Sequence, residues 1–163
     1  MRHLGKLVAV LALVLAQFTL TPAWADKAPV YQSGSGTAID GTDPVSYFTE
    51  GRPVAGDAGI THEWNGATWR FTSAENRDRF AASPEKYAPQ YGGYCAWAVS
   101  QGYTASTDPD AWSIVDGKLY LNNSLNVQKR FNSETQEIIH DADLNWKIIK
   151  AKKPGDLKEP IIR

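Results

Sequence analysis

Two tight-turn dipeptides, Asn65-Gly66 and Asp116-Gly117, constrain the fold of this chain more than any other feature. The short strand-like runs beside them are 61–64 and 68–71 for the first, and 112–115 and 118–121 for the second. Asn-Gly and Asp-Gly tolerate the positive φ angles that a two-residue hairpin turn requires. The sequence therefore predicts two antiparallel β-hairpins. Alternation along the second strand of the first hairpin puts Trp69 and Phe71 on one face.

Helical signals fill much of the remaining chain. Ser73 is a suitable cap for a helix ending at Ala82, because its hydroxyl accepts a hydrogen bond from a free backbone N–H of the first turn. Pro84 favours a short helical turn over 84–87. Residues 133–136 have the spacing of a capping box, which predicts that the C-terminal helix starts there. Apolar residues of that helix recur at helical intervals: Ile138, Ile139, Ala142, Trp146 and Ile149.

Two weaker patterns complete the prediction. Apolar residues Leu125, Val127 and Phe131 indicate a short helix before the C-terminal one, and 45–48 favours a short strand. Hairpins mixed with helices predict an α+β fold, a small single domain with two β-hairpins packed against short helices and a C-terminal helix. We find no internal repeat in the sequence.

The N-terminal segment predicts export. Basic residues precede an apolar run over 7–20, and Ala23-Trp24-Ala25 places small residues where a signal peptidase cleaves. The apolar run is shorter than the roughly 20 residues that a membrane span needs. We therefore expect a signal peptide over 1–25, cleavage near Ala25, a periplasmic or secreted product and no membrane anchor afterwards.

The rest of the chain divides into a folded part and two ends. A Ser/Gly/Pro-containing stretch over 26–36 predicts a flexible lead-in, 37–149 the folded domain with its C-terminal extension, and 150–163 a basic tail. The chain has 17 basic and 18 acidic residues, and no basic stripe dominates the folded part. We therefore expect no nucleic-acid partner.

The central segment resembles a known family. Asp43-Pro44-Val45, the run 64–73, Phe80 and Pro84-Glu85-Lys86-Tyr87 resemble the YHS domain in order and spacing. The run 91–98 and the second hairpin extend the likeness to an exported bacterial subfamily of YHS-domain proteins. The resemblance implies a domain associated with heavy-metal handling, notably of copper.

The chain departs from the metal-handling members of that family at three positions. Those members carry cysteines where this chain has Ser46, Thr72 and Asn76. Hydroxyl and carboxamide groups are poor ligands for the soft metals that thiolates bind. The resemblance therefore does not carry the family's ligand set to this chain, and any metal site would have to use other residues.

Cys95 and His62 are the candidate metal ligands. Cys95 is the one cysteine of the chain, a thiolate is the preferred ligand of Cu(I), and imidazole also suits copper. The hypothesis is a transition-metal site, with copper as the candidate metal, formed by these two side chains. The alternatives are a buried, inert thiol and an ordinary hydrogen-bonded histidine. His140 is the other histidine of the folded part, three residues before Asp143 on the C-terminal helix.

Two other functions remain open at this point. Cys95 with His62 is also the one pair suited to a thiol-dependent redox protein or enzyme, although no catalytic motif surrounds Cys95, so we expect a non-enzymatic protein. Alternatively, an aromatic cleft could hold a small molecule or a protein partner that the sequence does not identify. The aromatic stretch that indicates this cleft comprises Tyr91, Tyr94, Trp97 and Tyr103.

Overall fold

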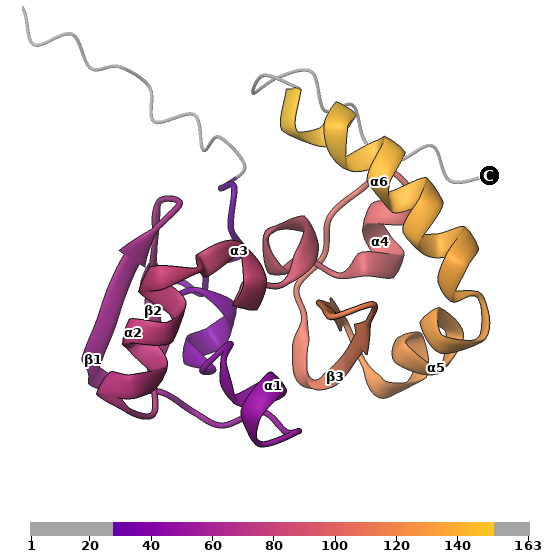
Figure 1. The fold of residues 1–163 in the computed structure, drawn as a ribbon. Helices are drawn as coiled ribbons and strands as arrows, with labels where there is room; N and C mark the ends of the chain where they lie inside the picture. The colour runs from indigo at the N-terminus through magenta and orange to yellow at the C-terminus, as the bar shows by residue number, and fades with distance from the viewer. Residues whose placement is uncertain (1–27, 152–163) are drawn as a thin grey trace, which may run out of the picture.

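A computed structural model describes residues 28–151 and has an α+β fold, with six α-helices and two antiparallel two-stranded sheets over that range (Figure 1). In chain order the elements are η1 (Ile39–Gly41), α1 (Ser46–Thr49), β1 (Asp57–Trp64), β2 (Ala67–Phe71), α2 (Ala74–Ala82), α3 (Pro84–Tyr87), η2 (Gln90–Gly93), α4 (Ala96–Ser100), β3 (Asp108–Val115), β4 (Lys118–Asn122), α5 (Leu125–Ser133) and α6 (Thr135–Ala151). The expected fold class is confirmed.

Both predicted hairpins form. β1 pairs with β2 and β3 pairs with β4, and in each case the turn residues have positive φ, 52° at Asn65 and 51° at Asp116. The first strand of each hairpin begins several residues earlier than the sequence indicates, because an irregularity in the register lets it continue. Trp69 and Phe71 share the buried face of β2, as alternation predicts.

Two local predictions are wrong. Residues 45–48 do not form a strand: the Asp43 carboxylate accepts the backbone N–H of Val45 at 2.8 Å, and the Ser46 hydroxyl donates to the Asp43 carbonyl at 2.7 Å. These local bonds turn the chain into α1. The capping box is also absent, because Ser133 is the last residue of α5 and its hydroxyl donates back to the carbonyl of Arg130 at 2.9 Å.

The structure repeats one supersecondary unit, although we found no repeat in the sequence. Each hairpin is followed by a serine-capped helix, and the same intervals separate the turn, the cap and a fully buried phenylalanine in both units. Ser73 accepts from the N–H of Asn76 at 3.1 Å, and Ser124 accepts from that of Val127 at 3.4 Å. The matching residues are Asn65 and Asp116, Gly66 and Gly117, Ser73 and Ser124, and Phe80 and Phe131. Few identities connect the units, so the repeat is visible chiefly in three dimensions.

Strand β4 lies between two hydrophobic cores. Leu119 and Leu121 belong to the core of the first unit, whereas Tyr120 belongs to the core formed with η2, α4, α5 and α6. Side chains of a strand alternate between its faces, so β4 is buried on both of them. This strand joins the two units of the fold.

The segment before η1 packs against the domain over 28–36, whereas the sequence indicates a flexible lead-in over 26–36. From residue 28 onward it is ordered by contacts: Val30 is completely buried, and the Tyr31 N–H donates to the carbonyl of Gly92 at 2.8 Å. A buried apolar side chain and satisfied backbone groups hold a Ser- and Gly-containing segment in place. The predicted signal peptide over 1–25 and most of the predicted tail lie outside the described residues, and Lys150 and Ala151 still belong to α6.

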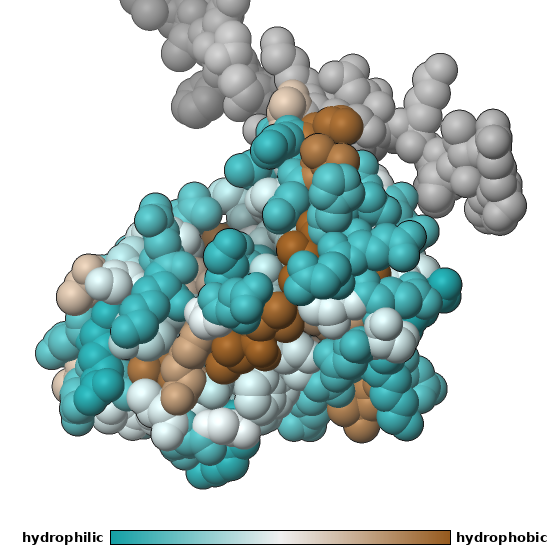
Figure 2. All heavy atoms as spheres, turned by 45° about the vertical axis from the view of Figure 1, so that its right-hand side comes forward, coloured by the Kyte–Doolittle hydropathy of each residue, from teal (hydrophilic) through white to brown (hydrophobic). Residues whose placement is uncertain are grey.

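Figure 2 shows the side of the molecule on which α5 and α6 lie. Apolar side chains are exposed there among polar ones. On these helices Leu125, Leu144 and Ile148 are each more than half exposed. Leu125 therefore lies outside the core, although it is one of the apolar residues whose spacing predicted the short helix. No helix among residues 28–151 has the length and apolar character needed to cross a membrane.

Candidate functional site

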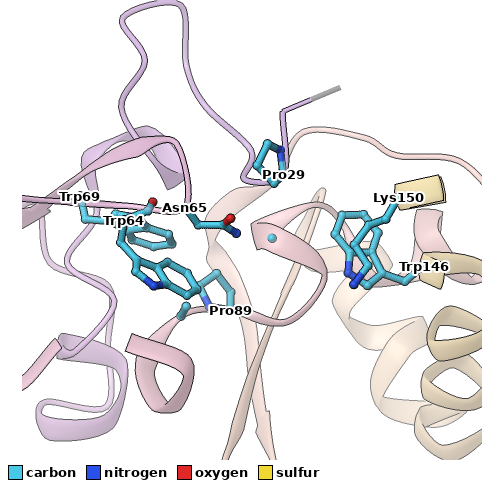
Figure 3. Close-up of a pocket in the computed structure, with 9 residues that line it drawn as sticks. Pro29, Trp64, Asn65, Trp69, Pro89, Trp146 and Lys150 are labelled. Carbon is cyan, nitrogen blue, oxygen red and sulfur yellow. The ribbon is translucent and has the colours of Figure 1, made fainter. Parts of the chain in front are cut away.

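An open cleft lies between the first hairpin and the end of α6 and is the candidate functional site (Figure 3). Its cavity volume is about 260 Å³, just below the roughly 300–1,000 Å³ usual for small-molecule sites, so it suits a small ligand. The described residues that line it are Pro29, Trp64, Asn65, Trp69, Ala88, Pro89, Gly92, Trp146 and Lys150. They come from the lead-in, the first hairpin, the connection between the units and the end of α6.

One wall of the cleft is formed by Trp64 at the end of β1. Its ring lies 5.9 Å from the ring of Trp69 and 5.8 Å, edge to face, from that of Phe80, measured between centroids. The Trp69 indole N–H donates to the Trp64 carbonyl at 3.0 Å, so the two indoles are also connected through the backbone. Trp64 is half-buried, and these contacts hold it in position without a ligand.

The opposite wall is formed by Trp146 on α6 (Figure 3). Its ring packs against Tyr91 and Tyr94, with 6.1 Å between centroids in both pairs. Tyr91 is itself fixed, because its hydroxyl donates to the Asp143 carboxylate at 3.0 Å. Burial, followed by the charge of Asp143, raises the pKa of this phenol well above its ordinary value, so Tyr91 remains a protonated donor.

The connection between the units forms the floor of the cleft. Tyr91, Gly92 and Gly93 all have positive φ, a conformation that favours glycine and costs an L-residue such as Tyr91 about 1 kcal/mol or more. A Cβ atom on Gly92 would lie 2.0 Å from the Pro29 carbonyl oxygen. Glycine at this position therefore lets the lead-in pass directly over the connection.

The cleft is positively charged on one side. Of the described residues that line it, Lys150 alone is charged, and its ammonium lies 5.8 Å from the centroid of the Trp146 ring. No carboxylate within residues 28–151 makes an ion pair with Lys150. Asn65, at the first turn position of the hairpin, supplies a carboxamide to the other side of the cleft (Figure 3).

Cys95 lies away from this cleft, at the start of α4. It is 1% exposed, its N–H donates to the Ala105 carbonyl at 3.1 Å, and its Sγ lies 4.0 Å from Oδ1 of Asn122. Burial raises the pKa of the thiol, so the protonated form prevails at neutral pH. Both properties fit the interpretation of Cys95 as a small buried side chain.

Asn122 breaks the similarity between the units. It ends β4 as Phe71 ends β2, and both side chains are completely buried. Its Oδ1 accepts the backbone N–H of Trp97 at 3.4 Å, but its Nδ2 has no hydrogen-bond partner in the described part of the chain. A polar group therefore replaces an aromatic core residue beside Cys95.

The structure does not record a contact between His62 and Cys95. His62 lies on β1, half-buried, with its imidazole 6.1 Å from the Phe80 ring, and thus belongs to the first unit. His140 is exposed on α6. The carboxylate of Asp143, three residues later, accepts a hydrogen bond from the Tyr91 hydroxyl. No group of three or more His, Cys, Asp or Glu side chains within 28–151 is arranged to hold a metal ion.

The three positions at which the resembled family carries cysteines surround Asp43. Oδ2 of this buried carboxylate accepts the backbone N–H and the hydroxyl of Thr72, at 2.9 and 2.8 Å, and Nδ2 of Asn76 at 2.7 Å. Ser46 bonds the Asp43 carbonyl, as described above. The side chains at these three positions all hydrogen-bond Asp43, so this network stabilises the local structure.

The observed cleft differs from the aromatic stretch that the sequence indicates. Tyr91 and Tyr94 support the cleft from behind Trp146, whereas Trp97 pairs with Tyr103 elsewhere, and Arg130 lies 5.2 Å above the Trp97 ring. Sequence reasoning missed Trp64 and Trp146 as partners. No spacing signal connects a residue of the first hairpin with one of the last helix, so only the fold could reveal the pair.

Comparison with known proteins adds no assignment: no protein-family model, curated protein or solved structure matches this chain. The resemblance to the YHS domain therefore stays a prediction.

Proposed function

We propose that this chain is a non-enzymatic, exported, YHS-like binding protein, and that the cleft between its first hairpin and α6 holds a small organic molecule. The observation that carries the proposal is the pair of indoles, Trp64 of the first hairpin and Trp146 of α6, which line one cleft. Aromatic side chains bury large apolar area at low entropic cost, so such walls suit an apolar or aromatic ligand.

The support behind each wall strengthens the proposal. Trp64 rests on the first core and Trp146 on the second, so ligand binding needs little further ordering of either side chain. Preorganised side chains spare a ligand the entropic cost of fixing them. By contrast, the described lining includes no side chain suited to act as a nucleophile paired with a base, which favours binding over catalysis.

Copper binding by Cys95 and His62 stays a prediction. A thiol that is 1% exposed and has a raised pKa must be uncovered and deprotonated before it binds a metal. The cleft can accept a ligand without exposure or deprotonation of a buried group. The geometry therefore supports ligand binding in the cleft better than copper binding by Cys95 and His62.

Fragment binding read by NMR would test the proposal, with indole and quinoline as probes. Both should shift the side-chain N–H signals of Trp64 and Trp146, because their rings would lie against these indoles. Trp64→Leu and Trp146→Leu should each remove saturation transfer to the probes. Trp97→Phe is the matched control, since Trp97 is a half-buried tryptophan outside the cleft.

Two results would overturn the proposal. One is that neither probe shifts the cleft tryptophan signals at millimolar concentration. The other is that the probes bind equally well to both wall variants once circular dichroism has shown that these variants are folded.

A further inference from the structure

We propose further, resting on the proposed function, that the ligand is a planar aromatic anion, such as an aromatic carboxylate, whose ring lies between Trp64 and Trp146 and whose charge pairs with Lys150. The inference rests on the charge, the polarity and the backbone chemistry of the cleft lining.

The charge of the lining selects the sign of the ligand. Lys150 contributes a cation and no described lining residue contributes an anion. Its ammonium is free of carboxylate partners within residues 28–151 and lies over the Trp146 ring, 5.8 Å from the centroid. A ligand ring against Trp146 would therefore have its substituent close to this cation. Indole and proline walls lower the local dielectric, which strengthens such an ion pair relative to one in open water.

The scarcity of polar side chains argues against a carbohydrate. Asn65 and Lys150 are the polar side chains of the described lining, and the other lining residues are tryptophan, proline, alanine and glycine. A sugar presents many hydroxyl groups, and each one buried without a partner costs about 1–3 kcal/mol. An aromatic ring with one charged substituent matches this lining better.

The backbone of the lining argues against an extended peptide. Peptides that add to a sheet edge need rows of backbone N–H and C=O groups. Pro29 and Pro89 line the cleft and have no N–H to offer, and the Gly92 carbonyl already accepts a hydrogen bond from the Tyr31 N–H. Side chains, rather than backbone groups, must therefore make the contacts that recognise the ligand, as in a small-molecule site.

Titration calorimetry with indole-3-acetate and indole-3-acetamide would test this inference, because the two share the ring and chain length and differ in charge. The carboxylate should bind the purified protein up to about fivefold more tightly, the effect of an ion pair of about 1 kcal/mol. Added salt should reduce this preference.

Lys150→Met should remove the preference for the carboxylate over the neutral amide. Lys147→Met is the matched control, because Lys147 is exposed one turn earlier on the same helix and does not line the cleft. Lys150 is exposed, so its substitution should not unfold the domain, and a thermal melt would verify this.

The outcomes separate this inference from the proposed function. Equal affinity for amide and carboxylate, or a preference that survives Lys150→Met, would overturn the anionic ligand while a cleft that binds indole still stands. Binding of indole and quinoline without binding of indole-3-acetate would do the same. Failure of all four compounds would overturn the inference and the proposed function together.

Discussion

Asp43 and Thr72 form a double hydrogen bond: one carboxylate oxygen of Asp43 accepts both the backbone N–H and the hydroxyl of Thr72, at 2.9 and 2.8 Å. The bond connects the segment before α1 with the junction between β2 and α2. Asn76 donates to the same oxygen and Val45 to the other one, so four donors depend on a single, completely buried side chain.

Asp43→Ala should therefore destabilise the domain strongly. Removal of the carboxylate leaves buried donors unpaired, at about 1–3 kcal/mol each, so we expect a loss of about 3 kcal/mol or more in the free energy of unfolding. Urea denaturation would measure it. Asp57→Ala is the control, because Asp57 accepts one backbone bond from Gly59 in an exposed position. Similar small losses in both variants would contradict a structural role for the Asp43 network.

Gly92→Ala should disturb both the fold and the cleft. The new Cβ would meet the Pro29 carbonyl at 2.0 Å, and φ is +63°, so we expect a loss of about 3 kcal/mol or more together with weaker fragment binding. Gly102→Ala isolates the backbone effect, since Gly102 has φ of +86° with no atom near its would-be Cβ, and it should cost about 1 kcal/mol. Equal melting temperatures for the two variants would show that the lead-in does not depend on Gly92.

Stability should fall at alkaline pH because buried phenols resist ionisation. Burial raises the pKa of Tyr47 and Tyr91 above the ordinary value of 10.0. Above that pH the unfolded chain releases protons that the folded chain keeps. Unfolding then becomes more favourable by up to about 1.4 kcal/mol per pH unit for each phenol. Below pH 9 this contribution to stability is fully present.

Urea denaturation between pH 8 and 11 would measure this dependence. Tyr91→Phe should make the fall of stability with pH shallower. The variant also loses the hydrogen bond to Asp143, which helps to position the ring that packs against Trp146. Tyr103→Phe is the control, since Tyr103 is 40% exposed. A wild-type curve that stays level to pH 11 would rule out the proposed effect of the buried phenols.

Cys95 should be unreactive in the folded protein. With 1% exposure and a raised pKa, its thiol should react with Ellman's reagent at pH 7.5 only after urea unfolds the chain. A titration of the reduced protein with Cu(I), performed on the same sample, examines the copper prediction.

The copper prediction has its own signature. Rapid thiol reaction with equimolar Cu(I) binding, lost in Cys95→Ser and weakened in His62→Ala, would establish a copper site and contradict the inert thiol. His140→Ala is the control for the histidine variant, because His140 is exposed on α6. An unreactive thiol and no bound copper would refute the copper prediction.

Much of the local structure followed from the sequence. The hairpin turns at Asn65 and Asp116, the cap at Ser73 and the helical turn at Pro84 depend on the conformational preferences of one or two residues. Such preferences act within a few residues and need no tertiary context. The prediction failed at 45–48 and at Ser133, where a side chain bonds its own neighbouring backbone in a way that periodicity does not reveal.

Only the tertiary structure decided the repeat of the hairpin–helix unit, the packed lead-in and the cleft. Trp64 and Trp146 are unremarkable in sequence, the first beside a turn and the second within the apolar period of a helix. They line one cleft because β4 contributes side chains to both hydrophobic cores. This shared strand fixes the position of α6, which carries Trp146, relative to the first hairpin, which carries Trp64. The sequence by itself determined which short segments turn, extend or coil, since these are local free energies. Which side chains line one cleft depends on how two hydrophobic cores share one strand, and that is a property of the whole fold.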